Sequence, residues 1–402
     1  MNIAKFILPM ACLLAGMAGV ASCSDDDNGG GSKKSRNKMA YVTDPAKVAM
    51  LRSMTDVEKS GGRLYEINYT ADYKLDEMLE AEATTFSQLT GFVAQNLFDV
   101  VPSTKLPVSY GAGCSAFAAT NSATGDYLMG RNFDFCHRDS TGYIPISAIL
   151  VRTAPKGRKK SISLVDGYFL GLKQGFYTDG KTDLSILMAL PYAPLDGINE
   201  DGFAMGVLAL DGKPTLQTEP GKKRIGTSVA IRMLLDNASD VDSAIELLKK
   251  YNMDMGAFGD KGNYHYFMAD AKGNYAIVEY VYPEGSDVPS IMKVLNQNDS
   301  MRYVTNFYVA PEMVPTPHGY YSKHGHDRYD TLKVKLPPLN YRVTDEQAMS
   351  LLSDVSQSPK PDVLTSFTQW SAVYNLSRKS MVLSILREYG KRYNFTVEKP
   401  QK

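Results

Sequence analysis

The chain has 402 residues, of which 44% are hydrophobic and 22% charged, an ordinary composition for a globular protein with a sizeable core. Lysine plus arginine and aspartate plus glutamate both number 44, so the formal net charge is zero. This balance gives no basic field that would attract nucleic acid and no basic run that would bind a membrane surface.

Residues 1–22 have the pattern of a signal peptide. Lys5 gives the first residues of the chain a positive charge. The apolar run 6–20 that follows is too short and too rich in Gly and Ala for a good transmembrane helix. The run ends in Val20-Ala-Ser-Cys23, which resembles a lipobox, the pattern in which the cysteine is lipidated and becomes the new N-terminus. A plain secretory signal with an incidental Cys23 is the alternative.

Residues 23–38 are rich first in Asp, then in Gly, then in basic residues, which predicts a disordered tether behind the lipidated cysteine. The acidic run after Cys23 resembles the surface-export signals of some Gram-negative lipoproteins. We therefore expect an outer-membrane lipoprotein that faces the periplasm or the cell surface.

Residues 39–113 are predicted to form a helical pro-segment. Apolar residues between Leu75 and Leu97 recur at spacings near three and four, as on the buried face of a helix. Pro102 and Pro107 then end the helical region and lead the chain, extended, into Gly111-Ala-Gly-Cys114.

Residues 114–402 change to short strands and turns with fewer helices. Helices are predicted at 228–235, 241–251 and 344–352. Strands are predicted at 161–165, 185–190, 203–210 and 302–308, and hairpins at 264–280 and 371–385. Because strands and helices do not alternate regularly, this pattern favours an α+β fold with largely antiparallel sheets.

Cys114 begins a predicted hairpin. Its first strand turns near 123–125 and returns along 127–135, which would bring Arg131 and Asp134 back beside the cysteine. If the chain is cut before Cys114, the freed α-amino group, with an ordinary pKa of about 7.7–8.0, can take the thiol proton without a histidine. We therefore predict autocleavage between Gly113, whose carbonyl is unobstructed, and a nucleophilic Cys114.

The other cysteine and histidine positions have simpler interpretations. Cys136 is expected to be a small buried apolar side chain, and it forms no dyad with His137 because adjacent strand residues point to opposite faces. His318, His324 and His326 lie in a Pro- and Gly-rich region without a carboxylate or cysteine that completes a metal site. A solvated loop is favoured there, and no metal or other cofactor is expected.

Four motifs then follow one another along the chain: Gly113-Cys114, Gly130-Arg-Asn-Phe-Asp-Phe135, Asp196-Gly-Ile-Asn-Glu-Asp-Gly202 and Val304-Thr-Asn306. Together they resemble the N-terminal-nucleophile cysteine hydrolases of the choloylglycine hydrolase group, which includes bile salt hydrolases, penicillin V acylases, N-acylethanolamine acid amidase and acid ceramidase. The resemblance covers nearly all of residues 113–395. It implies an αββα sandwich of two mostly antiparallel sheets, preceded here by the helical pro-segment.

The resemblance also implies a role for each matched residue. Cys114 would attack an amide carbonyl, and its own amine would act first as base and then as acid. Asp134 would position that amine, and Arg131 would lower the thiol pKa. Asn306 and a backbone N–H near Ala209 would bind the oxyanion, after which water would hydrolyse the thioester.

One further position matches the family, and other features separate this chain from bile salt hydrolases. Arg328, in Asp327-Arg-Tyr329, matches a later site arginine of the family. Ala209 stands where bile salt hydrolases carry an Asn, which argues against bile-salt specificity. The long segment before Cys114 resembles N-acylethanolamine acid amidase and acid ceramidase, in which it stays bound as an α subunit.

The predicted function is that of an exported, self-cleaving cysteine amidase that hydrolyses N-acyl amines or N-acyl amino acids. We expect the acyl group to be a fatty-acyl group. Bile salt hydrolysis, penicillin acylase activity and acyl transfer are alternatives within the same fold. A surface ligand-binding lipoprotein is the non-enzyme alternative, but it leaves the cysteine, Arg–Asp and Thr–Asn motifs unexplained. Taken alone, Arg131 and Asp134 could also be a structural ion pair. The expected partners are the small-molecule substrate and the retained pro-segment, with no nucleic acid and with membrane contact only through the lipid.

Overall fold

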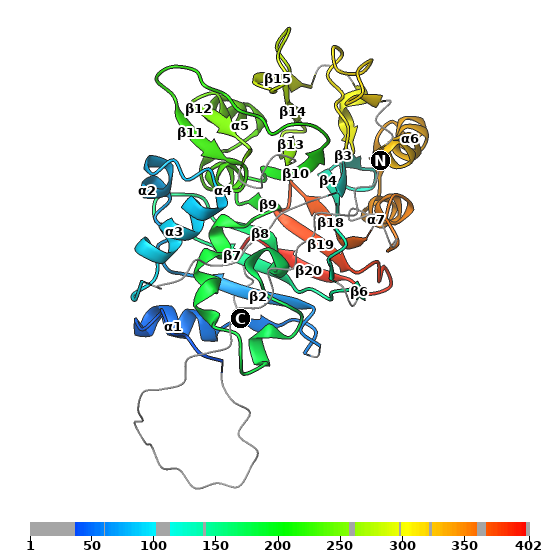
Figure 1. Ribbon diagram of the computed structural model, residues 1–402. Coiled ribbons are helices and arrows are strands. Elements are labelled where there is room, and N and C mark those ends of the chain that lie inside the picture. Colours follow the sequence, from blue (N-terminus) through cyan, green and yellow to red (C-terminus); the bar gives the residue numbers. More distant parts are fainter. Residues whose placement is uncertain are drawn as a thin grey trace, which may run out of the picture.

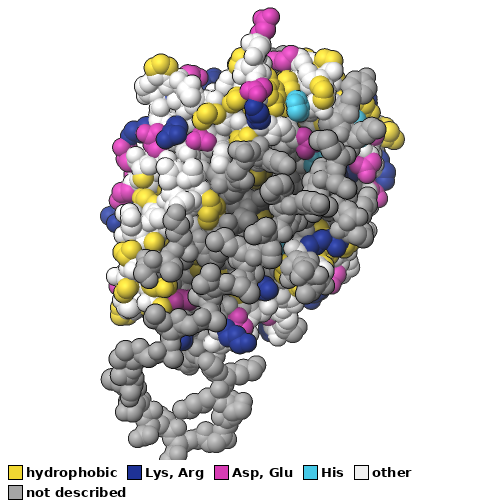
Figure 2. Space-filling model, in the orientation of Figure 1, with side chains coloured by type: hydrophobic (Ala, Val, Ile, Leu, Met, Phe, Trp, Pro, Cys, Tyr) yellow, Lys and Arg dark blue, Asp and Glu magenta, His cyan; other side chains and the backbone are white. Residues whose placement is uncertain are grey.

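The computed structural model describes residues 37–59, 61–101, 113–139, 142–256, 262–296, 299–320, 324–359 and 367–398. Two β-sheets form its centre, and helices lie outside them (Figure 1). The expected signal peptide, Cys23 and nearly all of the tether lie outside the described residues. On the face drawn in Figure 2, the visible basic and acidic side chains are interspersed, as the zero net charge leads one to expect.

The larger sheet has nine strands in the order β1-β2-β7-β8-β9-β10-β13-β14-β15. Neighbours are antiparallel except β2 and β7, which run parallel. The strands are β1 (Thr55–Asp56), β2 (Leu64–Tyr69), β7 (Ala148–Thr153), β8 (Ser161–Asp166), β9 (Asp196–Asn199), β10 (Ala204–Leu210), β13 (Asn263–Ala269), β14 (Tyr275–Val281) and β15 (Ile291–Leu295).

The smaller main sheet has seven strands, in the order β16-β3-β4-β18-β19-β20, with β17 parallel to β3. Its strands are β3 (Gly113–Asn121), β4 (Tyr127–Asp134), β16 (Tyr303–Val304), β17 (Arg342–Val343), β18 (Thr368–Asn375), β19 (Ser380–Ile385) and β20 (Tyr393–Thr396). Two further pairs are β5 (Arg138–Asp139) with β6 (Gly142–Tyr143), and β11 (Lys223–Gly226) with β12 (Tyr251–Asp254).

The helices are short, and within the described ranges none is long and apolar enough to cross a membrane. The α-helices are α1 (Pro45–Arg52), α2 (Leu75–Glu80), α3 (Phe86–Asn96), α4 (Thr227–Asn237), α5 (Val241–Leu248), α6 (His326–Lys335) and α7 (Asp345–Asp354). The 3₁₀ helices are η1 (Gly167–Leu170), η2 (Phe176–Thr178), η3 (Leu184–Tyr192), η5 (Asp299–Arg302) and η7 (Pro337–Leu339).

The layers follow the order helix, sheet, sheet, helix. Helix α4 packs against β9 and β10, β10 packs against β3 of the other sheet, and α7 packs against β4 and β18. Strands β13 and β18 are buried at every position, as expected for strands covered on both faces. The prediction of an α+β fold with two largely antiparallel sheets is confirmed.

The pro-segment is not the helical unit that its apolar spacing predicts. Helices α2 and α3 match that spacing, but β2 enters the nine-stranded sheet and pairs in parallel with β7, from Leu64 opposite Ala148 to Tyr69 opposite Thr153. The run Leu64–Tyr69 contains two tyrosines and an isoleucine, which favour a pleated, half-buried surface. The segment therefore shares one core with the rest of the chain.

Charged groups join the pro-segment to the C-terminal strand of the other sheet. The Glu58 carboxylate, whose side chain is 1% exposed, accepts hydrogen bonds from Arg63, Lys391 and Tyr393. Burial alone would raise the pKa of Glu58, but these hydrogen bonds lower it to about 2. In the same segment, Tyr73 Oη donates to buried Asp236 on α4 at 2.6 Å.

One predicted element in the body is wrong, and two end early. Residues 185–190 form part of η3 rather than a strand, because a fully apolar run has no periodicity that separates the two and Pro191 disfavours a central strand. The predicted strand 302–308 stops at Val304. The second predicted helix ends at Leu248, so that residue 251 begins β12.

Candidate active site

The hairpin that begins at Cys114 is formed as expected. Strands β3 and β4 are antiparallel, with Gly113 opposite Asp134 and Ala116 opposite Arg131. The turn between them is held by the Asn121 side chain, whose Oδ1 accepts the N–H groups of residues 123 and 124. Cys114 itself is fully buried at the start of β3.

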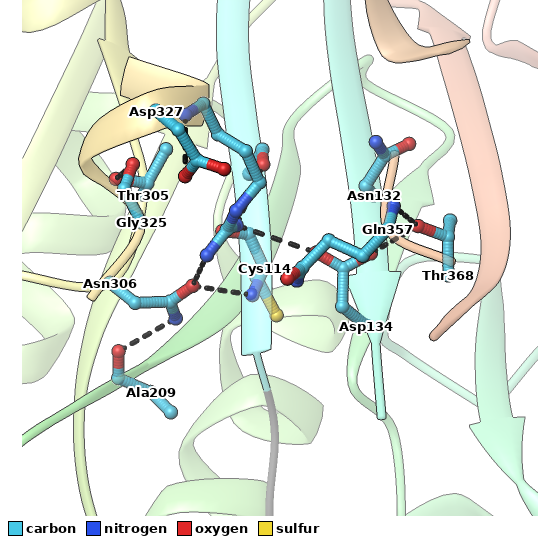
Figure 3. A network of polar contacts seen from close by, with 12 residues as sticks. Cys114, Asn132, Asp134, Ala209, Thr305, Asn306, Gly325, Asp327, Gln357 and Thr368 are labelled. Atoms are coloured by element: carbon cyan, nitrogen blue, oxygen red, sulfur yellow. Dashed lines mark hydrogen bonds and ion pairs between the residues drawn. The ribbon is translucent and has the colours of Figure 1, made fainter. Parts of the chain in front are cut away.

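Two side chains from far along the sequence meet the backbone of Cys114 (Figure 3). Asn306 Oδ1 accepts the Cys114 N–H at 2.8 Å and also accepts Arg328 Nη2 at 2.8 Å. Arg328 Nη1 donates to the Cys114 carbonyl oxygen and, at 2.9 Å, to Ser115 Oγ. The same Nη1 lies 3.4 Å from Asp134 Oδ2. The structure thus brings Cys114, Asp134, Asn306 and Arg328 together.

Asp134 is fully buried and held by neutral donors as well as by Arg328. Thr368 Oγ1 donates to its Oδ1 at 2.6 Å, and Gln357 Nε2 donates to its Oδ2 at 2.9 Å. Burial raises the pKa of Asp134, and Arg328, Thr368 and Gln357 oppose that rise. A carboxylate fixed opposite Gly113 is in place to orient an amine released at Cys114. Thr368 and Gln357 belong to no motif, so no pattern in the sequence indicated them.

Arg131 and Asp134 do not pair with each other, which contradicts the simple ion-pair interpretation. Arg131 Nε donates to Asp196 Oδ2 at 2.7 Å, and its Nη2 donates to the Val207 carbonyl at 2.7 Å. The Cys114 thiol donates to the same carbonyl at 3.3 Å, so the guanidinium lies beside the thiol. Burial raises the pKa of the Cys114 thiol in this uncut chain, whereas the Arg131 charge lowers it.

Asp196 is a residue that the sequence interpretation missed. Its buried carboxylate binds Arg131 and also accepts Trp370 Nε1 at 3.0 Å and Tyr374 Oη at 2.6 Å. It is the first residue of the family-like turn, which was the available indication. Gly197 follows it because a Cβ there would lie 2.6 Å from the carbonyl oxygen of Ile162.

Ala209 takes part in the site through its backbone. Asn306 Nδ2 donates to the Ala209 carbonyl at 2.8 Å. Because the N–H and C=O of one residue in an antiparallel strand point to the same side, the Ala209 N–H faces the same side as that carbonyl. The Asn306 amide nitrogen carries two hydrogens, one of which Ala209 accepts. The assignment of these two donors to an oxyanion stays a prediction.

The early end of β16 explains how Asn306 reaches Cys114. Strand β16 pairs with β3 at Tyr303–Phe117 and Val304–Ala116. One more step of this ladder would set the backbone of residues 305 and 306 opposite residues 115 and 114. Instead the chain leaves the sheet, and the Asn306 side chain takes the Cys114 N–H.

The remaining cysteine and histidines contact other groups. Cys136 is fully buried, and His137 Nε2 lies 2.6 Å from Asp166 Oδ2 in a second buried cluster. His318 stacks on Tyr282, and His326 stacks on Tyr320. Over the part of the chain that the structure describes, no three His, Cys, Asp or Glu side chains are grouped so as to hold a metal ion.

Residues 186–381 match the family model of acyl-coenzyme A:6-aminopenicillanic acid acyl-transferase. This part of the chain is therefore similar to that acyl-transferase domain. The match includes Asp196, Ala209, Asn306 and Arg328, and it begins after the Cys114 hairpin.

Individual relatives and solved structures have low sequence identity to this chain. An uncharacterized protein of Archaeoglobus fulgidus is 24% identical over an alignment of 254 residues, and the match covers 58% of this chain and 38% of that relative. Among solved structures, a mutant of conjugated bile acid hydrolase from Clostridium perfringens has a TM-score of 0.47 at 14% identity, over 70% of this chain and 92% of that chain. Penicillin V acylase from Agrobacterium tumefaciens has a TM-score of 0.44 at 16% identity, over 68% and 83%.

Gly206 gives a test of the Arg131 position. A Cβ at Gly206 would lie 2.5 Å from Arg131 Cδ and 2.6 Å from its Nε, so we expect Gly206→Ala to move the guanidinium away from the thiol. The rate of the predicted cleavage at Gly113–Cys114 should fall about 10- to 100-fold, the scale of a misplaced catalytic group. The rate is read from the appearance of two bands on a denaturing gel. Gly91→Ala is the control, because a Cβ added at Gly91 would meet no neighbouring group within 4 Å. A Gly206→Ala chain that cleaves at the control rate contradicts this role of Arg131.

Proposed function

We propose that this protein is a self-cleaving cysteine amidase that hydrolyses N-acyl amides through a thioester on Cys114. The observation that carries the proposal is that Asn306 and Arg328 bind the backbone of Cys114, while Asp134 pairs with Arg328 beside it. A structural cysteine needs no such set, because each buried polar or charged group costs free energy unless it is fully paired. The same argument counts against a ligand-binding lipoprotein without chemistry.

The geometry supports a definite sequence of steps after cleavage. The peptide N–H that now donates to Asn306 becomes an α-amine, which takes the proton of the Cys114 thiol. The thiolate, beside Arg131, adds to the acyl carbonyl, and the new oxyanion faces the Ala209 N–H and the second Asn306 hydrogen. The C–N bond then breaks as the α-ammonium group returns this proton to the leaving amine and becomes a neutral amine again. Water attacks the thioester, releases the carboxylic acid and restores the thiol.

Acyl transfer is the second candidate, and the match to an acyl-transferase family model favours it. It differs from hydrolysis only in the last step, because an amine instead of water takes the acyl group from Cys114. The described residues of the site serve both reactions equally.

The pro-segment is proposed to stay bound as an α subunit. Strand β2 lies between β1 and β7 of the larger sheet, and its side chains belong to the common core. The Glu58 cluster adds hydrogen bonds to the C-terminal strand. Separation would expose this apolar surface to water, so the cut chains have reason to remain together.

Mass analysis tests the cleavage. We expect wild-type protein to give two chains, split between Gly113 and Cys114, that elute together in size-exclusion chromatography. Cys114→Ala should remain one chain and lose turnover, since it lacks the nucleophile. Cys136→Ala, which removes the other buried thiol of the body, is the matched control and should cleave normally. A single unbroken wild-type chain with full activity would rule the mechanism out.

A substrate panel tests the acyl specificity. Matured protein is incubated with N-fatty-acyl amines or amino acids, with conjugated bile salts and with penicillin V, and released acid is measured. We expect the fatty-acyl amides to react fastest, because Ala209 lacks the polar side chain found in bile salt hydrolases. Each assay is repeated with an added primary amine, and an N-acyl product of that amine would indicate transfer. Strong bile-salt turnover without fatty-amide turnover contradicts the proposed substrate.

We also propose that Cys23 anchors the protein, as a lipoprotein, to the outer membrane of a Gram-negative bacterium. The sequence Val20-Ala-Ser-Cys23 and the polar residues behind it support this location. Wild-type protein should therefore be found in the outer-membrane fraction, and Cys23→Ala should be lost from it. An alanine variant that fractionates like wild type counts against lipidation.

A further inference from the structure

A second set of buried polar groups lies behind Asn306. His265 on β13 and Glu279 on β14 are both fully buried, and His265 Nδ1 lies 2.9 Å from Glu279 Oε1. His265 Nε2 lies 2.8 Å from the carbonyl oxygen of Thr305. The Glu279 carboxyl accepts the backbone N–H of Val309 at 3.0 Å and that of Ala310 at 2.9 Å. The pair thus holds both ends of the segment 305–310.

The arrangement of partners fixes the hydrogens of this pair. A carbonyl oxygen only accepts, so His265 Nε2 carries a hydrogen. Between Nδ1 and Oε1 there is one further proton, on either the imidazole or the carboxyl group. In both forms the pair has no net charge, and each of its hydrogen bonds is made. A buried His–Glu pair of this kind avoids the cost of an isolated charge.

The segment that the pair holds carries the site residues. Asn306 follows Thr305 directly, and its side chain bonds to Cys114. Thr305 Oγ1 also donates, at 3.0 Å, to the carbonyl of Gly325, the N-cap residue of α6 (Figure 3). Helix α6 carries Arg328. His265 is therefore one hydrogen bond and one residue from Asn306, and two hydrogen bonds from the helix of Arg328.

We propose that His265 and Glu279 are positioning residues for the Cys114 site. They bind backbone groups of the segment 305–310 and so hold it off the open edge of β3, where the β16 ladder would otherwise continue. As a result Asn306 accepts the Cys114 N–H with its side-chain oxygen, while its Nδ2 donates to the Ala209 carbonyl. The proposal rests on the function proposed for Cys114, because its effect on turnover is exerted through Asn306 and Arg328.

Two substitutions of nearly equal size separate the contacts of His265. In His265→Gln the amide nitrogen reaches the place of Nε2 and retains the bond to Thr305. In His265→Asn the amide reaches only the place of Nδ1 and loses that bond. We expect His265→Asn to lower kcat about 10- to 100-fold with KM within about threefold of wild type, because the catalytic groups are misplaced while the substrate pocket remains. His265→Gln should keep most of the wild-type kcat.

Glu279→Gln is the conservative variant of the second residue. Its amide nitrogen can donate to a neutral His265 Nδ1 while its oxygen accepts the Val309 and Ala310 N–H groups, so we expect nearly wild-type kcat. His137→Asn is the control, since it breaks another buried His–carboxylate pair, with Asp166, outside the segment. Unfolding of every variant is followed by the fluorescence of Trp370, the single tryptophan.

The outcomes distinguish positioning from general destabilisation. Equal kcat for His265→Asn and His265→Gln, or an equal loss in His137→Asn at equal stability, overturns the proposal. A readout independent of turnover is amide hydrogen exchange over 113–121 in a Cys114→Ala background, which should be faster with His265→Asn than with His265→Gln. If the wild-type enzyme hydrolyses no acyl amide, the proposed function fails, and the exchange comparison still decides the role of His265.

Discussion

The backbone of Cys114 has to be satisfied in a fully buried place where its strand has lost one neighbour, and much of the site follows from this constraint. On the side of β3 that faces away from β4, no described strand lies beside Cys114, so the N–H and C=O of Cys114 need other partners. Asn306 Oδ1 takes the N–H, and Arg328 takes the carbonyl. Because side chains hold these groups, the Gly113–Cys114 bond is paired with β4 on one side and has no described strand on the other.

Two buried ion pairs lie on different sides of Cys114, one beside its thiol and one beside its backbone. Arg131 is bound to Asp196 and lies on the thiol side of Cys114, whereas Asp134 is bound to Arg328 on the backbone side. Each pair is almost completely buried, so the loss of one partner would leave an uncompensated charge. Were Arg131 and Asp134 paired with each other, neither would have its separate position. The zero net charge of the chain gives no indication of where these buried charges lie.

The sequence predicted what local pattern controls and missed what distant segments supply. The Cys114 hairpin follows from alternation and a short turn, and Arg131 and Asp134 come with it. Asn306 and Arg328 were found only through motif resemblance, since nothing local points from residue 306 to residue 114. Asp196 meets Arg131 across the two sheets, and Thr368 meets Asp134 from the neighbouring strand β18. Gln357 and His265 likewise act through contacts with residues far from them in the sequence. Strand β2 was missed because its partner β7 lies about eighty residues ahead, and η3 because an unbroken apolar run has no period.

The place of the pro-segment in the fold determines what a cut at Gly113 can change. Strand β2 lies in the larger sheet, and β3 belongs to the smaller one. A cut between Gly113 and Cys114 would therefore leave every strand pair whole, except that Gly113 would be separated from the rest of β3. The contacts of Asn306, Arg328, Asp134 and Arg131 are already made in the uncut chain. The proposed cleavage would therefore have no site left to assemble. Its chemical effect would be to turn the amide nitrogen of Cys114 into a base among contacts that are already made.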